Sequence, residues 1–183
     1  MNIINDFLSP NPYSRPKLML DIVKGIVIHY VANPGTSAKQ NRDFFENRKF
    51  GETGYGSAHF IIDLDGSIIQ CISEKEIAYH VGAVTYIDGI QKKLSPYPND
   101  STIGIECTHI DLTGIMTDET YYTLIGFCTL LCRNYHLDPD KSLYLHYEIT
   151  GKICHKWFVD NPLEWEIFKN KVKEKYDFYF KHN

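Results

Sequence analysis

The residues of this chain best suited to metal chemistry are His146 and Cys154, eight positions apart, and His29, which lies far upstream in an apolar run. Imidazole and thiolate groups are among the ligands that zinc prefers, and catalytic zinc sites use three protein ligands and leave one position for water. His29, His146 and Cys154 would form a set of two imidazoles and one thiolate. Spacing alone leaves the alternative open, because a single histidine in an apolar strand is more often a core residue bonded to a carbonyl group.

Two charged residues could act on a molecule held at such a site. Glu106 interrupts an apolar segment, and burial would raise its carboxyl pKa toward neutrality, as a general base or acid requires. Gly104, two residues away on the same strand face, would leave room for a substrate beside Glu106. Lys152 lies between His146 and Cys154 and could bring its ammonium group to a developing oxyanion. The alternatives are a carboxylate at a solvated strand end and an ordinary solvated lysine.

The remaining histidines and cysteines carry weaker signals. His80, beside Gly82, could line a pocket and contact a substrate, whereas His59 is more consistent with a core or positioning residue. The other four cysteines fall in apolar segments and are interpreted as small buried hydrophobic side chains; they are Cys71, Cys107, Cys128 and Cys132.

Composition excludes several classes of protein. The chain of 183 residues has 43% hydrophobic and 23% charged residues, which is typical of a soluble globular domain rather than a disordered one. A formal net charge of -4 and the lack of a basic stripe argue against nucleic-acid binding. The odd number of dispersed cysteines argues against a disulfide framework. We find no secretory signal peptide and no apolar run long enough to span a membrane.

The elements that must position these residues follow from hydrophobic periodicity and capping signals. We predict strands over residues 25–31, 57–63, 67–72, 102–107 and 142–146, and helices from Ser37 to about Gly51, over 117–136, and over 162–183. The second and third strands flank Asp65-Gly66, which predicts a hairpin with a type I′ turn. Residues 1–21 are expected to be an irregular arm, 86–100 a long loop at the wall of a cleft, and 147–161 irregular. The pattern indicates one α/β domain over residues 1–183, with a central mixed β-sheet flanked by helices.

Over residues 22–160 the order of these segments resembles the zinc-dependent N-acetylmuramoyl-L-alanine amidases, the family shared by phage lysins, bacterial autolysins and peptidoglycan-recognition proteins. Five segments carry the resemblance, and together they are more specific than any one of them. They are Gly25-Ile-Val-Ile-His29-Tyr, Ser57-Ala-His-Phe-Ile-Ile-Asp63, Ala78-Tyr-His80-Val-Gly82, Ile103-Gly-Ile-Glu106 and His146-Tyr-Glu-Ile-Thr-Gly-Lys152-Ile-Cys154.

The resemblance implies a peptidoglycan-recognition-protein-like amidase fold in which His29, His146 and Cys154 bind one Zn²⁺ ion. Some members place a catalytic tyrosine where this chain has Ala58, and others use a strand glutamate, to which Glu106 corresponds. The family usually has proline after the ligating cysteine, whereas this chain has His155, which could act as a spurious ligand.

The activity that the resemblance implies is hydrolysis of the amide joining the lactyl group of N-acetylmuramic acid to L-alanine in bacterial peptidoglycan. The protein would be a monomeric phage endolysin or autolysin catalytic domain. It would be made in the cytoplasm and act on the cell wall after release. Two alternatives stay open: a module that binds peptidoglycan without cutting it, and a cysteine peptidase with Cys154 as nucleophile.

Overall fold

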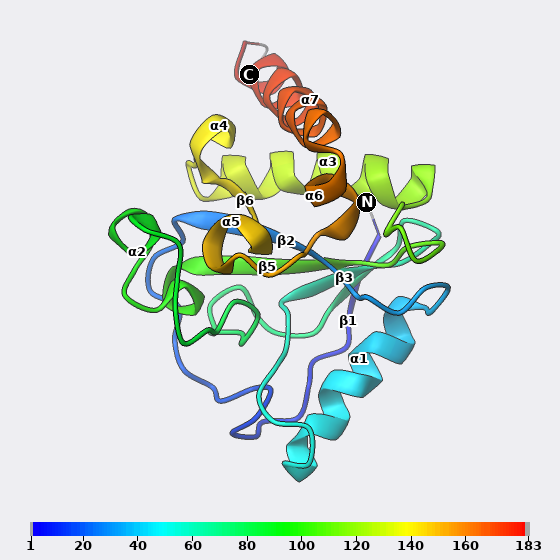
Figure 1. Cartoon of the computed structure of the whole chain (residues 1–183), viewed down its shortest axis with the longest axis vertical. Coiled ribbons are helices and arrows are strands. Elements are labelled where there is room, and N and C mark those ends of the chain that lie inside the picture. The colour runs from blue at the N-terminus through cyan, green and yellow to red at the C-terminus, as the bar shows by residue number, and fades with distance from the viewer. Residues whose placement is uncertain (1, 182–183) are drawn as a thin grey trace.

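A six-stranded mixed sheet in the order β1-β4-β3-β5-β2-β6 lies at the centre of the protein (Figure 1), whose computed structural model describes residues 2–181. Its strands are β1 (Ile3–Asn5), β2 (Gly25–Tyr30), β3 (Phe60–Ile62), β4 (Ile68–Gln70), β5 (Thr102–Cys107) and β6 (Leu143–Leu145). Its helices are α1 (Ala38–Asn47), η1 (Arg48–Phe50), α2 (Ile90–Lys93), η2 (Pro98–Ser101), α3 (Asp118–Asn134), α4 (Pro139–Ser142), α5 (His146–Thr150), α6 (Lys156–Asp160) and α7 (Pro162–Lys181). The predicted α/β class is confirmed.

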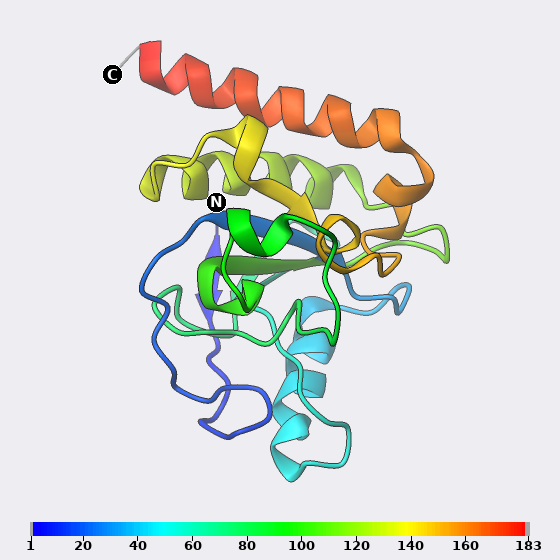
Figure 2. The same ribbon diagram turned by 60° about the vertical axis from the view of Figure 1, so that its left-hand side comes forward.

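Helices lie on both faces of the sheet. Figures 1 and 2 show α3 on one side, with α7 stacked outside it, and α1 on the other side. Successive residues of a strand point to opposite faces. In β2, Ile26 and Ile28 therefore join the core beneath α3, while Val27 and His29 point to the opposite face. This alternation decides which face carries the polar residues of the strands.

The layer of α3 and α7 is held by apolar side chains. Thr117 caps α3 as predicted, because its side chain accepts a hydrogen bond from the backbone N–H of Thr120 at 3.1 Å. Cys128 and Cys132 lie on the buried stripe of α3, which confirms their interpretation as core residues. The side of α7 that joins this core carries Trp165, Phe168 and Val172.

On the opposite face, α1 covers only part of the sheet. Its N-terminus has the predicted capping box, in which Ser37 and Gln40 satisfy each other's backbone N–H groups. The helix packs on β3 and β4, where Ala38 joins a small core with Ile61 and Ile69. The neighbouring strands β5 and β2 are therefore left uncovered by α1 at the end where His29 lies.

Two predictions about irregular segments are partly wrong. The arm over residues 1–21 contains β1, which pairs in parallel with β4, with Ile3 opposite Ile68; residue 1 lies outside the described part of the chain. The segment 147–161 contains most of α5 and the short α6, and His146 begins α5 instead of ending the preceding strand.

Two loops also differ from expectation. The predicted loop over 86–100 contains α2 and most of η2. The hairpin between β3 and β4 is confirmed, but its turn is not type I′, since Gly66 has a φ of +78° and Asp65 does not have a positive φ. A Cβ atom on Gly66 would lie 2.9 Å from the carbonyl oxygen of Glu119, so a glycine also lets the turn approach α3.

The final helix begins at Pro162, as predicted, and runs to Lys181; residues 182 and 183 of the predicted range lie outside the described residues. Among the helices formed by residues 2–181, we find none that combines the length and the apolar character needed to cross a membrane.

A buried ion pair fastens the N-terminal arm to the body of the domain. The Nε and Nη2 atoms of Arg15 donate to the two carboxylate oxygens of Glu76 at 2.9 and 2.8 Å, and Lys17 adds a contact at 3.0 Å. The side chains of Arg15 and Glu76 are only 11% and 8% exposed. The Arg15 guanidinium beside Glu76 lowers the pKa of that carboxyl group.

Replacement of Glu76 by alanine should lower the free energy of unfolding by about 3 kcal/mol, because it leaves the Arg15 guanidinium buried without a counter-ion. Urea denaturation would measure the change. The control is Glu166→Ala, which removes a 60% exposed carboxylate paired with Lys169 and should change stability by less than about 0.5 kcal/mol. Equal effects of the two variants would show that the arm is not held by this pair.

Candidate metal centre and cleft

The pairing of three parallel strands brings the chemically important residues together. In the register of β2 and β5, His29 lies directly opposite Glu106. In the register of β2 and β6, Ile28 pairs with Leu145, so that the next residue, His146, emerges beside His29. Because the carboxyl ends of parallel strands meet at one edge of a sheet, ligands of α/β proteins commonly bind there.

A short hairpin of the chain returns Cys154 to this edge. The side chain of Glu148 accepts a hydrogen bond from the backbone N–H of Leu145 at 2.7 Å and fixes the start of α5. Gly151, with a φ of +78°, ends the helix after little more than one turn. The chain then folds back, and the N–H of Tyr147 donates to the carbonyl oxygen of Cys154 at 2.8 Å.

His29, His146 and Cys154 form a compact cluster of buried donors. Their ligand atoms lie within 4.8 Å of one another, and no other such group of three is found among residues 2–181. The Nδ1 atom of His29 is 3.1 Å from Nδ1 of His146 and 3.6 Å from Sγ of Cys154. At that separation the two nitrogen atoms can share a hydrogen bond or, when both present lone pairs, bind one cation. The donor set and its convergence therefore fit a metal cation.

A chain of hydrogen bonds orients the ring of His29. The Thr102 hydroxyl donates to the carbonyl oxygen of Pro98 at 2.6 Å, so it accepts from Nε2 of His80, which lies 3.1 Å away. Nδ1 of His80 is then an acceptor, and it lies 3.1 Å from Nε2 of His29. This network assigns the hydrogen of His29 to Nε2 and leaves Nδ1 free to face His146 and Cys154.

The space beside Gly104 is occupied by the ring of His80 and is not available to a substrate. A Cβ atom at this position would lie 2.5 Å from Cγ and 2.7 Å from Nδ1 of the His80 ring. The expectation that Gly104 leaves room for a substrate beside Glu106 is therefore wrong, because the imidazole of His80 occupies that space. The same strand face needs a glycine so that the ring can lie flat against β5.

Burial keeps the imidazoles of the cluster neutral. Desolvation, followed by repulsion from His146, holds the pKa of His29 well below its ordinary value, and desolvation together with Lys152 lowers the pKa of His146 to about 4. A neutral imidazole is the form that binds metals. Burial and the nearby Glu106 raise the pKa of Cys154 to about 12, so its thiol is protonated at neutral pH when no cation is bound.

Glu106, His146 and Lys152 line one cleft of about 650 Å³. The Oε2 atom of Glu106 is buried and has no hydrogen-bond partner, although the side chain is partly exposed. Burial raises the pKa of this carboxyl group to about 8, and the positive charge of Lys152 opposes the rise. Glu106 is thus a carboxyl group that can take up or release a proton near neutral pH.

The cleft brings together several residues that the sequence analysis did not single out. Asn99 accepts hydrogen bonds from the backbone N–H groups of His80 and Val81 and fixes one wall. Arg48, the first residue of η1, and the loop residues Tyr55 and Tyr79 also line the cleft. No spacing rule connects these residues, which are joined only by the fold. The predicted wall at 86–100 contributes Asn99, and Ala83 and Val84 continue the cleft into a second hollow beside it.

The other histidines named from sequence lie as follows. His59 is buried, accepts from the N–H of Gly104 at 3.0 Å and donates to the carbonyl oxygen of Glu76 at 2.8 Å, as a positioning residue would. His155 is not part of the donor cluster; its ring lies among aromatic side chains, 4.9 Å from that of Phe158. His80 lines the cleft, but its ring nitrogens are engaged by other residues of the protein. Ala58 is fully buried.

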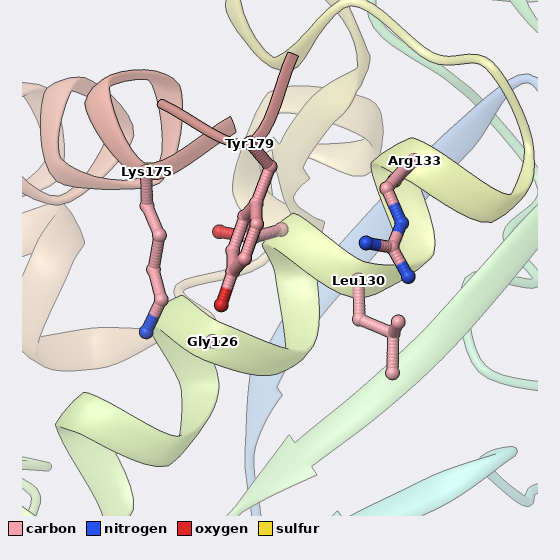
Figure 3. Close-up of a pocket in the computed structure, with 6 residues that line it drawn as sticks. Gly126, Leu130, Arg133, Lys175 and Tyr179 are labelled. Carbon is pink, nitrogen blue, oxygen red and sulfur yellow. The ribbon is translucent and has the colours of Figure 1, made fainter. Parts of the chain in front are cut away.

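A separate hollow of about 170 Å³ lies between α3 and α7 (Figure 3). Arg133 and Leu130 border it from α3, and Lys175 and Tyr179 border it from α7. It shares no lining residue with the cleft and contains no side chain of the donor cluster. We therefore assign it no part in the chemistry of the donor cluster.

Comparison with known proteins shows the family to which this chain belongs. Residues 19–157 match the model of the family described as N-acetylmuramoyl-L-alanine amidase. The N-acetylmuramoyl-L-alanine amidase BlyA of Bacillus subtilis strain 168 is 33% identical over 177 residues, which cover 93% of this chain and 47% of BlyA. The N-acetylmuramoyl-L-alanine amidase CwlL of Bacillus licheniformis is 32% identical over 175 residues, which cover 94% of this chain and 47% of CwlL. The chain thus spans about half the length of these relatives.

Solved structures share the fold. The catalytic domain of XlyA superposes with a TM-score of 0.71 at 23% identity, over 94% of this chain and 99% of that domain. The structure of PlyL gives a TM-score of 0.74 at 20% identity, over 94% of this chain and 98% of PlyL. At these identities the likeness concerns the fold alone, and it confirms the predicted architecture.

Substitution of Gly104 by alanine should lower the free energy of unfolding by about 2 kcal/mol or more, because the added methyl group overlaps the His80 ring. Gly82→Ala is the control, since its nearest atom, on Asn99, would lie 3.5 Å from the new Cβ, an ordinary contact. Urea denaturation of both variants would check this. A Gly104→Ala protein as stable as Gly82→Ala would contradict the close packing of His80 on β5.

Glu106→Gln should stabilise the cation-free protein increasingly as pH rises. Between the ordinary carboxyl pKa of 4.5 and the folded value of about 8, the folded state keeps a proton that the unfolded state has released, so the wild type loses stability with rising pH. Glutamine removes this loss. The stability difference should grow by on the order of 2 kcal/mol from pH 5 to pH 8 in urea titrations with chelator present. A difference independent of pH would mean that the carboxylate is well solvated.

Proposed function

We propose that this chain, which belongs to the N-acetylmuramoyl-L-alanine amidase family, hydrolyses the amide between the lactyl group of N-acetylmuramic acid and L-alanine in peptidoglycan. The observation that carries the proposal is the convergence of His29, His146 and Cys154 beside the cleft that holds Glu106 and Lys152. The chain would act on the bacterial cell wall after release from the cell, as a monomeric endolysin or autolysin catalytic domain.

His29, His146 and Cys154 would hold one zinc ion. Two neutral imidazoles and one thiolate are a donor set that suits zinc and leaves a position for a further ligand. When bound, zinc supplies Lewis-acid polarisation of the scissile carbonyl and lowers the pKa of water. His80 would serve as a positioning residue, because it fixes the ring of His29 through the hydrogen bond at 3.1 Å.

Glu106 would carry the proton through the reaction. Its unpaired Oε2 atom can accept a proton from the attacking water molecule. The same carboxyl group can then donate that proton to the amine nitrogen of L-alanine as the C–N bond breaks, so the carboxylate is regenerated. A carboxyl pKa raised toward neutrality suits both steps, since the group must gain and lose the proton within one turnover.

Lys152 would stabilise negative charge on the carbonyl oxygen. It lines the cleft together with Glu106, and its positive charge is close enough to lower the pKa of His29 and His146. A cation facing the oxygen of the tetrahedral intermediate stabilises that intermediate more than the planar amide. The Lys152 side chain is exposed and is therefore able to reorient.

The chemistry of Cys154 argues against the cysteine-peptidase alternative. A nucleophilic cysteine needs a lowered thiol pKa, whereas burial raises the pKa of this thiol to about 12. His29, its neighbour at 3.6 Å, has a pKa held well below the ordinary value and is therefore a weak base. Both features suit a cysteine that becomes a thiolate when it binds a cation.

Two variants should separate catalysis from metal binding. Glu106→Gln should retain one zinc per chain but release N-terminal alanine from purified cell walls at least about 100-fold more slowly, because the proton acceptor is lost. Cys154→Ala should lose both the zinc and the activity. Zinc content by elemental analysis and amine release from the walls are the two measurements.

The same assays exclude the alternatives. A Cys154→Ala protein that lacks metal and still cuts walls at the full rate would refute the zinc proposal. A metal-loaded wild type that binds walls but releases no amine would instead be a binding module. Activity that survives a chelator but not thiol alkylation would indicate a cysteine peptidase. Glu166→Gln, on the exposed face of α7, is the control for Glu106→Gln and should have full activity.

A further inference from the structure

Arg48 is a cleft residue whose guanidinium group is held in place by the protein. It lies at the junction of α1 and η1, and its Nη1 atom donates to the carbonyl oxygens of Thr53, Gly54 and Tyr55 at 2.7, 3.1 and 3.2 Å. Three acceptors on one nitrogen fix the direction of the group. They also tie the loop between η1 and β3 to the side chain.

Phe44 and the backbone at Gly56 also pack against the guanidinium group. Its Cζ atom lies 4.8 Å from the centre of the Phe44 ring. A Cβ atom at Gly56 would lie only 2.9 Å from the same Cζ, so a glycine lets the backbone approach the group closely. A guanidinium held in this way loses little further conformational entropy when it binds a ligand.

The remaining donors of Arg48 have no acceptor. Nε is buried without a partner, Nη2 makes no hydrogen bond, and no carboxylate lies within ion-pair distance among residues 2–181. Arg15 provides the contrast within the same chain, because its Nε and Nη2 atoms bind the two oxygens of Glu76 at 2.9 and 2.8 Å. On Arg48 the Nη2 donor is left for an anionic acceptor that the protein itself does not supply.

The charges that line the cleft favour an anion. They are the positive charges of Arg48 and Lys152, against the single carboxyl group of Glu106. The cleft is thus positive in a chain whose formal net charge is -4. A local positive potential in a cleft attracts anionic substrates and raises their rate of association. Burial also lowers the pKa of Arg48, a cost that a bound anion would offset.

We propose that Arg48 binds an ionised carboxylate of the stem peptide, and that the protein therefore prefers stem peptides with a free carboxylate to those amidated at the same position. This inference rests on the proposed amidase function and adds a determinant of substrate choice. Nη2 is the first donor that the ligand meets, because Nε is covered in this conformation. Arg48 acts here as a specificity residue, away from the reacting atoms.

A purely structural role for Arg48 makes a different prediction. If the side chain serves only to brace the 53–55 loop, its removal should slow the cleavage of all stem peptides to the same degree. If it binds a carboxylate, its removal should slow cleavage of the carboxylate substrates and leave that of the amidated ones much less affected. The ratio of the two rates separates the roles, because general damage to the cleft cancels in the ratio.

The test compares pairs of soluble muramyl peptides that differ only in a carboxylate or a carboxamide, at the second or at the third residue of the stem. Zinc-loaded wild type should cleave the carboxylate form with a kcat/KM about 10-fold or more higher at one of the two positions, as charge-assisted hydrogen bonds allow. Arg48→Gln should bring that ratio close to 1. Arg48→Lys, which keeps the charge but not the planar fork, should give an intermediate ratio.

Arg133→Gln is the matched control, because Arg133 is an exposed arginine outside the cleft and its loss should leave the ratio unchanged. Equal kcat/KM of the wild type for both members of each pair would overturn the inference while leaving the amidase activity in place. An equal loss on both members in Arg48→Gln would also overturn it, in favour of the bracing role. Failure of the wild type to cleave any of the peptides would refute the proposed function itself, and this inference with it.

Discussion

The site depends on the parallel pairing of β2 with β5 and β6. One register sets His29 opposite Glu106, and the other sets His146 immediately beyond the end of β6. A slip of one residue in either pairing would turn these side chains to the face that packs under α3. The core residues Ile26, Ile28 and Ile105 prevent such a slip, since they would then have to leave the apolar layer. The hydrophobic packing of one face therefore sets the geometry of the polar groups on the other.

A second constraint works within that frame. The hydrogen bonds from Pro98 through Thr102 and His80 determine which nitrogen of His29 faces the other donors. This series of hydrogen bonds is possible because Gly104 lets the His80 ring lie against the strand, and because Asn99 binds the backbone N–H of His80. Two glycines, Gly104 and Gly56, thus allow close packing of cleft residues, one against a histidine ring and one against a guanidinium group.

Much of this arrangement could be predicted from the order of residues, and the exceptions have physical causes. The longer elements were predictable because hydrophobic period and caps such as Ser37 and Thr117 act locally. The strand β1 was not, since three exposed residues acquire their conformation only from pairing with β4. Short helices such as α5 depend on contacts with distant residues. Arg48 was missed because it is notable for donors that have no acceptor in the protein, which only the structure can show. The role of Gly104 was missed because it depends on the His80 ring, 24 positions away in the chain.

The backbone contact between Tyr147 and Cys154 has a consequence for how the donor cluster is filled. Two of the three donors belong to a single closed hairpin, so the chain has already lost the entropy of bringing them together when the domain folds. A cation arriving from solution would find His146 and Cys154 already close together and would not have to order a flexible segment. After the cation leaves, the hairpin would keep these two donors in place, so another cation could bind without refolding of the polypeptide.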